Sequence, residues 1–445
     1  MKPKMHLAFD LSKTHLEGRW HQPGSWPGAT FPDFTMFENV VKIAERGKLD
    51  MVFFGDGTGL PSTWGGSHEA AGRWGVGWPR HDMSPYIAAM GRSTKHIGFG
   101  LTYSSTFMHP FYVARLLNSL DHITNGRMAF NVVASTRFSD AANYGFDELM
   151  AHGQRYERME EFVDVCKALW ASVDTDAFIW DRTSGIVADP AKIRPINHVG
   201  KHFRVRGPLP NVPSPQVAPI LIQAGASPRG IAASAHFADL VFAANYSLEA
   251  ATAHRRKLDA ALIAKNRNPS KVGILSLINV VVEETQAEAN RRKEQLLDLL
   301  PEEGVGAFFS DKAGYDFSQL PDRFSPGELN DMITKSGASP TGFVFKLAEM
   351  VGHDTVITRR DFFEHAKRDV TEYDITFAGP PARVADLLEE MFDAADNRGG
   401  FMFSAASVTP HDHQQIVDLL VPELQRRGRF RTEYEGTTLR ENLGA

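Results

Sequence analysis

The chain has 445 residues, of which 42% are hydrophobic and 23% are charged, and its formal net charge is -6. Such a composition belongs to a globular protein with a sizeable core, and the length allows two to three domains or one α/β barrel. A mild negative charge without a basic stripe argues against a nucleic-acid-binding protein.

The N-terminus and the cysteine content indicate where the protein works. The first residues lead directly into an apolar stretch, Met5–Phe9, without the longer apolar core of a secretory signal. No run approaches the ~20 apolar residues that a membrane span needs. Cys166, the only cysteine, excludes an internal disulfide and fits a reducing compartment. We therefore expect a cytoplasmic protein that does not contact a membrane.

A long loop follows the first predicted strand, Met5–Phe9. Residues 11–34 are rich in Gly, Pro, Trp and His and have no periodicity, which is typical of a functional loop. Apolar spacing then predicts a helix over 34–46 and a buried strand over 49–54. Asp56 stands between two glycines directly after that strand, where its carboxylate could meet a ligand. Ordinary turn chemistry explains this pattern equally well.

Residues 97–135 form the clearest unit of the chain. The apolar runs 97–101 and 128–133 are short enough to be strands, and the segment between them has helical apolar spacing. Strand, helix and strand of this length predict a right-handed βαβ unit with parallel strands. Small polar residues, among them Thr102 and Asn131, stand towards the carboxyl ends of these strands. Parallel α/β folds bind their ligands at that end.

Two predicted helix starts are suited to an anion. The helix 152–172 begins with His152 and Tyr156, which are four residues apart and therefore share a face. Ser227 is expected to be the N-cap of a second helix, which begins at Pro228. Backbone N–H groups and the dipole at a helix N-terminus favour a phosphate. Each feature also has a structural explanation, because Tyr156 could pack in the core and N-cap serines are common.

The remaining strands and helices alternate to the C-terminus. We interpret residues 173–218 as an inserted arm or hairpin, residues 301–370 as a second insertion, and residues 427–445 as a tail of mixed charge. Eight or nine strands alternating with helices then predict one α/β domain, a (β/α)8 TIM barrel with inserted segments. The His-Asp-His triplet at 411–413 has no spaced partner ligand, so no metal site is expected.

Several segments carry a family resemblance, and together they span almost the whole chain. They are residues 48–57, 97–135, 152–162, 223–242 and 421–444. The most specific are SLDHITNGR followed by FNVVAS, and RGRFRTEYEGTTLRENLG. The chain resembles the bacterial luciferase-like flavin monooxygenases, in the branch of nitrilotriacetate monooxygenase component A, dibenzothiophene-sulfone monooxygenase and long-chain alkane monooxygenase.

The resemblance implies a luciferase-like barrel with FMN at the carboxyl end of its strands. It implies that a separate NAD(P)H:flavin reductase supplies FMNH2, and that O2 reacts as a C4a-(hydro)peroxyflavin to oxygenate a small-molecule substrate. It also implies a homodimer or homotetramer. Carried over residue by residue, the flavin contacts fall on Asp56, Thr102, Asn131, His152, Tyr156 and Ser227. The catalytic histidine near the flavin falls on His15, with Trp20 beside it and His21 as an open alternative.

Substrate and reaction class stay open at this point. An acidic substrate would need clustered arginines, and the sequence does not decide whether Arg73, Arg80 and Arg137 converge. A deazaflavin-dependent dehydrogenase of the same barrel superfamily is one alternative, because it would transfer a hydride without O2. A non-catalytic flavin-binding protein is the other, and it would bind oxidised flavin without turnover.

Overall fold

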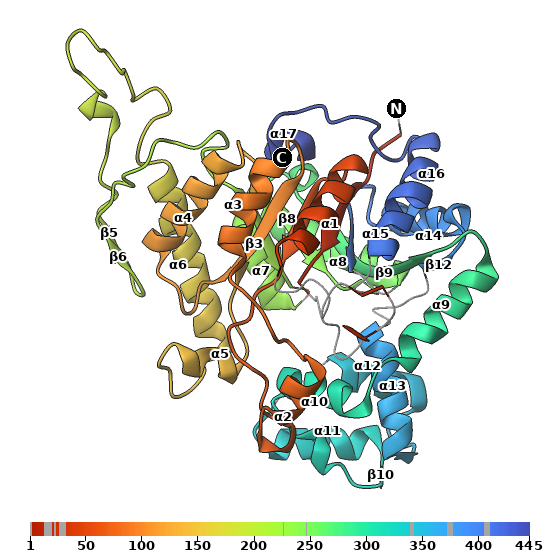
Figure 1. Ribbon diagram of the computed structural model, residues 1–445. Helices are drawn as coiled ribbons and strands as arrows, with labels where there is room; N and C mark the ends of the chain where they lie inside the picture. Colours follow the sequence, from red (N-terminus) through yellow and green to blue (C-terminus); the bar gives the residue numbers. More distant parts are fainter. Residues whose placement is uncertain are drawn as a thin grey trace.

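The computed structural model describes residues 2–12, 20–21, 24–25, 33–225, 227–245, 247–338, 342–371, 377–404 and 410–445. Within these residues, eight parallel strands form a closed barrel, which confirms the predicted (β/α)8 TIM barrel (Figure 1). The barrel strands are β1 (His6–Asp10), β2 (Met51–Phe54), β3 (Gly98–Ser104), β4 (Met128–Val133), β7 (Ile220–Ala224), β8 (Leu240–Ala243), β9 (Gly273–Val282) and β13 (Gly399–Ser404). Each strand pairs with the next one named here, and β13 pairs with β1 to close the ring.

Helices surround the barrel (Figure 1), and their buried apolar side chains form one hydrophobic cluster with those of the strands. They are α1 (Thr35–Arg46), α3 (Met83–Ser93), α4 (Pro110–Ile123), α6 (His152–Trp170), α7 (Pro228–Phe237), α8 (Leu248–Ala264), α14 (Pro381–Ala394), and the consecutive segments α15 (Pro410–Gln415), η6 (Ile416–Leu420) and α16 (Val421–Arg426). Outside the ring, β12 (Phe377–Gly379) pairs with β9, and α9 (Gln286–Asp298) follows β9.

The predicted βαβ unit is β3, α4 and β4, and local residues explain its bounds. Pro110 opens α4 with a backbone angle that suits a first helical turn, and His109 Nδ1 accepts a hydrogen bond from the Phe111 N–H at 3.3 Å. After α4, Asn125 and Gly126 adopt positive φ angles of 57° and 78°. Few residues besides Gly and Asn tolerate this conformation, which turns the chain directly into β4.

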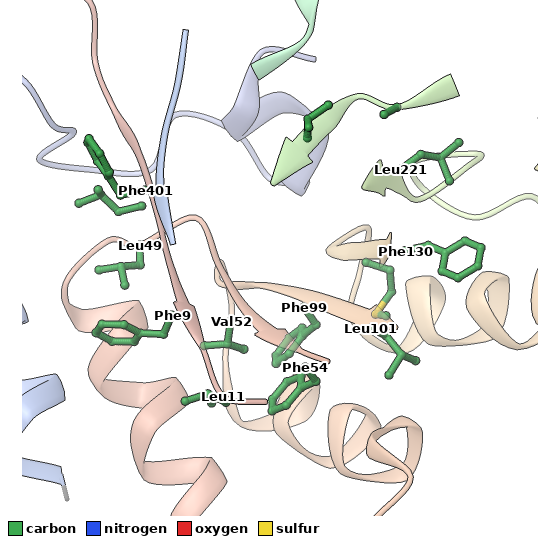
Figure 2. Packing of buried hydrophobic residues seen from close by; sticks show 14 of the residues in the cluster. Phe9, Leu11, Leu49, Val52, Phe54, Phe99, Leu101, Phe130, Leu221 and Phe401 are labelled. Atoms are coloured by element: carbon green, nitrogen blue, oxygen red, sulfur yellow. The ribbon is translucent and has the colours of Figure 1, made fainter. Parts of the chain in front are cut away.

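Strand side chains alternate between two buried regions. The inner faces fill the barrel, with Ala8, Phe53, Ala129, Ile222, Leu275 and Met402 among the buried residues. The outer faces meet the helices, and Figure 2 shows Phe9, Val52, Phe54, Phe99 and Phe130 among these side chains. Because both faces of each strand are buried, the strands form the continuous apolar runs that are typical of parallel sheets.

The predicted tail of mixed charge closes the amino end of the barrel. Leu439, the first residue of α17 (Leu439–Leu443), packs with the barrel interior. Arg431 forms a buried ion pair with Asp50. Burial alone would raise the pKa of Asp50, but Arg431 and then His6 outweigh it, so the pKa is lowered. The C-terminal tail therefore covers this end of the barrel through apolar packing and a buried ion pair.

The two predicted insertions differ in structure. The arm between α6 and β7 carries the antiparallel strands β5 (His198–Val199) and β6 (Arg204–Val205) and extends away from the barrel (Figure 1). The second segment, which we call the helical insertion (residues 300–371), has a hydrophobic cluster of its own. It contains α10 (Glu302–Ala313), α11 (Pro326–Lys335), α12 (Gly342–Val351), α13 (Arg359–Thr371), β10 (Arg323–Phe324) and β11 (Ile357–Thr358).

The helical insertion packs on the segment that follows β2. This segment contains the short helix α2 (Glu69–Trp74), whose Trp74 Nε1 donates to Glu303 of α10 at 2.6 Å. The Gly65 N–H donates to Asp316 at 3.0 Å. In the described part of the chain, no helix is both long enough and apolar enough to cross a membrane.

Candidate functional site

A layer of polar side chains lies inside the barrel at the carboxyl end of its strands. It consists of Asp10, Thr102, Asn131, Asn279 and Ser404, all of them buried. Asp10 pairs in register with Ser404, Ser404 with Asn279, and Thr102 with Asn131. Asn131 Nδ2 donates a hydrogen bond to Thr102 Oγ1 at 3.0 Å. The structure thus places the predicted residues Thr102 and Asn131 side by side at the expected end of the barrel.

Sequence reasoning missed three members of this layer: Asp10, Asn279 and Ser404. Each stands two positions after a residue of the barrel interior, as Asp10 follows Ala8. Side chains two residues apart in a strand face the same side. Two-residue alternation, applied from the interior positions towards each strand end, is the signal that would have found them.

The carboxamide oxygen of Asn131 is a candidate contact for a ligand. Its Oδ1 is buried and has no hydrogen-bond partner among the described residues. A buried oxygen without a partner costs about 1–3 kcal/mol, and such atoms are rare in native interiors. A bound ligand with an N–H or O–H donor would satisfy this oxygen. The barrel end therefore fits a ligand that presents a hydrogen-bond donor to this oxygen, as an N–H group of a flavin ring would.

Asp56 lies on the rim of the barrel, two residues after β2. Its Oδ1 accepts a hydrogen bond from the Gly57 N–H at 2.8 Å. Burial raises the pKa of Asp56, Arg80 and the Gly57 N–H oppose this, and the carboxylates of Asp82 and Asp140 reinforce it. Because burial and the neighbouring carboxylates disfavour the charged form of Asp56, a ligand that donates hydrogen bonds would stabilise it. The hydroxyl groups of a ribityl chain are donors of this kind.

A cavity of about 470 Å³ opens beside Asp56. Its lining comes from the loop after β2, and from Gly77, Trp78, Arg80, His81, Asp82, Tyr103, Met108, Asn143 and Tyr144. An adjoining recess contains both Asp56 and Thr102, so the structure brings these two predicted residues together. The volume falls in the range of ordinary cofactor and substrate pockets, about 300–1,000 Å³.

Two of the three candidate arginines converge at this rim. A Cβ placed on Gly57 would lie 1.5 Å from Arg137 Nη2 and 3.1 Å from Arg80 Nη1, so both guanidinium groups pack against this glycine. Arg73 lies elsewhere, where it pairs with Glu303 at 3.1 Å. Arg80 and Arg137 therefore converge at the rim, and Arg73 does not join them.

The predicted anion-binding residues lie at two neighbouring helix starts. His152 and Tyr156 stand in the first turns of α6, and their ring centroids are 5.0 Å apart. Ser227 is the N-cap of α7, as predicted, and its Oγ accepts from the Gly230 N–H at 3.1 Å. Arg229 of α7 lies over the Tyr156 ring, 5.2 Å from its centroid. Thus α6 and α7 present Tyr156 and Ser227 to the same region, since they follow the adjacent strands β4 and β7.

The cationic side chain at the start of α7, Arg229, is already paired with a carboxylate. Arg229 makes two hydrogen bonds to Glu160, at 2.6 and 2.9 Å, so its guanidinium is bound to a carboxylate. An anion here would rely on the first-turn N–H groups of α7, the Ser227 hydroxyl and the Tyr156 hydroxyl. His15, the predicted catalytic histidine, lies outside the described residues. In the described part of the chain, no group of three or more His, Cys, Asp and Glu side chains is arranged to hold a metal ion.

Comparison with known proteins finds relatives that match this chain over almost its full length. A family model described as luciferase-like monooxygenase matches residues 15–398. Dibenzothiophene-sulfone monooxygenase of Rhodococcus erythropolis (strain XP) is 34% identical over 451 residues, which cover 99% of this chain and 96% of the relative. Nitrilotriacetate monooxygenase component A of Aminobacter aminovorans is 35% identical over 449 residues, which cover 98% and 95%. A riboflavin lyase, solved with modified FMN and riboflavin, has a TM-score of 0.88 at 26% identity and covers 99% and 96%.

Proposed function

The chain belongs to the luciferase-like monooxygenase family, and from this premise we propose that it oxygenates a small organic substrate with O2 and reduced FMN. A separate NAD(P)H:flavin reductase supplies the FMNH2. One relative is named as component A of its enzyme, which fits a division of labour between two proteins. The observation that carries the proposal is the buried polar layer, in which Asn131 Oδ1 has no hydrogen-bond partner among the described residues, at the end of a barrel related to monooxygenases over its full length.

We assign the parts of the cofactor to the two groups of residues described above. Asn131 Oδ1 would accept a hydrogen bond from a ring N–H, and Thr102 and Asp56 would contact the ring edge and the ribityl chain. Tyr156, Ser227 and His152 would bind the phosphate. Ser227 can do so without leaving its capping position, because a hydroxyl that accepts one hydrogen bond still has a proton to donate.

The proposed reaction balances with one O2 per substrate. Bound FMNH2 supplies two electrons and the substrate supplies two; one oxygen atom enters the product and the other leaves as water. The protein must keep bulk water from the reacting atoms, because otherwise the electrons end in hydrogen peroxide. Trp78, Tyr144 and Met108 supply apolar surface to the cavity. His15, from the resemblance, would hold or donate a proton at the oxygen that leaves.

The test is oxygenation with isotopically labelled O2. The protein, FMN, NADH and a generic flavin reductase are incubated with sulfones, thioethers, aminopolycarboxylates and alkanes under ¹⁸O2, and products are read by mass. We expect one class to gain a single labelled oxygen atom only when the reductase is present. Substrate oxidation with oxidised deazaflavin as the hydride acceptor, in the absence of O2, would instead identify a dehydrogenase. Tight binding of oxidised FMN with no product in any arm would identify a flavin-binding protein.

A substitution at Ser227 tests the phosphate assignment. We expect Ser227→Ala to weaken FMN binding by about 10- to 150-fold, since a hydrogen bond to a charged group contributes about 1.5–3 kcal/mol. Riboflavin lacks the phosphate, so its dissociation constant should stay within about twofold. Isothermal titration with both flavins measures the difference.

Ser247→Ala is the matched control for that substitution. Ser247 is the N-cap of α8 and accepts from the Ala250 N–H at 3.1 Å, the same geometry as Ser227 on the neighbouring helix. Both variants lose a similar capping contribution, about 1 kcal/mol. The phosphate assignment is contradicted if the two variants bind FMN equally well, or if Ser227→Ala weakens riboflavin as much as FMN.

A further inference from the structure

A buried charged cluster joins the barrel rim to the helical insertion. Arg137, at the start of α5 (Phe138–Asn143), donates from Nε and Nη2 to Asp140 at 3.1 and 3.3 Å. Its Nη1 donates to Asp311 of α10 at 3.2 Å, across 174 positions of sequence. Both carboxylates are buried, with side-chain exposures of 8% and 9%. One guanidinium thus holds two acids that would otherwise repel each other.

The same cluster fixes the backbone directly after Asp56. Asp140 Oδ1 accepts hydrogen bonds from the Thr58 N–H and the Gly59 N–H, both at 2.7 Å. Asn143 of the same helix donates from Nδ2 to the Thr58 carbonyl oxygen at 2.7 Å. We call residues 57–59 the rim loop. The Thr58 N–H, the Gly59 N–H and the Thr58 carbonyl oxygen are therefore bonded to α5, and Arg137 is paired with the Asp140 carboxylate that accepts from the two N–H groups.

Arg137 also touches the rim loop itself. Its guanidinium occupies the space that a side chain at Gly57 would fill, as the 1.5 Å approach to a placed Cβ shows. Gly57 in turn donates its N–H to the Asp56 carboxylate. Arg137 is thereby connected to Asp56 through a single intervening residue, Gly57.

We propose that Arg137 is a positioning residue: it sets the conformation of the rim loop, and so the placement of Asp56, and makes that placement depend on docking of the helical insertion through Asp311. This proposal rests on the proposed function in one respect, since Asp56 is taken to contact the flavin. Burial raises the pKa of Asp311 and Arg137 opposes this. Loss of Arg137 would therefore leave an unpaired buried acid at the docking surface.

The test combines two substitutions that disturb Arg137 in different ways. Arg137→Gln removes the charge, whereas Gly57→Ala keeps every charge and displaces the guanidinium. We expect each to raise the dissociation constant of FMN by about tenfold, the size of effect that a displaced binding group produces. Because glutamine is shorter, Gly57→Ala should add less than about twofold in the Arg137→Gln background. Additive effects would show that Gly57→Ala acts without Arg137.

Hydrogen exchange of the rim loop gives a readout that needs no flavin. The Thr58 and Gly59 amides are expected to exchange about tenfold faster in both single variants, as local opening becomes easier. Arg73→Gln is the matched control, because Arg73 also pairs with α10, through Glu303, but the structure gives it no hydrogen bond to the rim loop. It should leave both rim-loop exchange and FMN affinity unchanged.

The outcomes separate this proposal from the proposed function. Unchanged rim-loop exchange in Arg137→Gln and Gly57→Ala, with a melting temperature lowered no more than in Arg73→Gln, would overturn the positioning role even if FMN binds. Faster exchange without a change in FMN affinity would overturn the link to Asp56. A wild-type protein that binds no FMN would overturn the proposed function, while exchange still decides whether Arg137 holds the loop.

Discussion

Asn131→Leu is expected to weaken FMN binding by about 5- to 150-fold while the protein stays as stable as the wild type. The loss corresponds to about 1–3 kcal/mol, because the flavin would keep a buried N–H without an acceptor. Stability should be spared because leucine has a similar volume, and because the loss of the Nδ2 hydrogen bond to Thr102 is offset by removal of the buried Oδ1, which lacks a partner among the described residues. Fluorescence titration with FMN and urea denaturation measure the two quantities.

Asn118→Leu is the matched control for this substitution. Asn118 lies in α4 and is 1% exposed, and its Oδ1 likewise has no partner among the described residues. Its Nδ2 donates to the Val212 carbonyl oxygen at 3.2 Å, outside the barrel interior. The variant should bind FMN as the wild type does. If both leucine variants lowered FMN affinity equally, Asn131 would have no special place in the site.

Arg127→Met is expected to cost about 3–5 kcal/mol of unfolding free energy, since several buried carbonyl groups would lose their donor together. Arg127 is 2% exposed. It donates to the carbonyl oxygens of Gly91 at 2.7 Å, Ile97 at 2.8 Å, Thr94 at 3.1 Å and Thr124. These bonds join the ends of α3 and α4 to β3. Burial lowers the pKa of Arg127 to about 10, so the guanidinium stays charged at neutral pH.

Urea denaturation followed by circular dichroism measures this loss. Arg127→Lys should recover only part of the stability, because an ammonium group cannot reach four carbonyl oxygens arranged around a planar fork. Arg182→Met, at an exposed position of the arm, should change stability by less than about 0.5 kcal/mol. A stability loss below about 1 kcal/mol in Arg127→Met would contradict the structural role given to this side chain.

The barrel was predictable because its determinants are local. The strand at Met128–Val133 was predicted with the bounds that the structure has, since turn residues end each short apolar run. Thr102 and Asn131 were predictable as neighbours, because consecutive parallel strands of a βαβ unit pair side by side. Ser227 was predictable as an N-cap from the proline that follows it.

Contacts between distant segments were not predictable. Nothing near Arg137 indicates Asp311 as its partner, because the pair forms only when the helical insertion docks. The segment at α10 contains Gly304 and Gly306, which disfavour a helix locally, yet the structure is helical there. Gly306 lies against Trp64, where a Cβ would approach the indole to 2.0 Å. Tertiary packing, which a local pattern does not contain, explains that glycine.

The most direct measurement is a crystal structure of the protein with FMN. Our account predicts the isoalloxazine ring inside the carboxyl end of the barrel, with Asn131 Oδ1 within hydrogen-bond distance of a ring N–H. It predicts the phosphate at the start of α7, in contact with the hydroxyl groups of Ser227 and Tyr156. A flavin bound outside the barrel end, or a phosphate that touches neither helix start, would contradict the account.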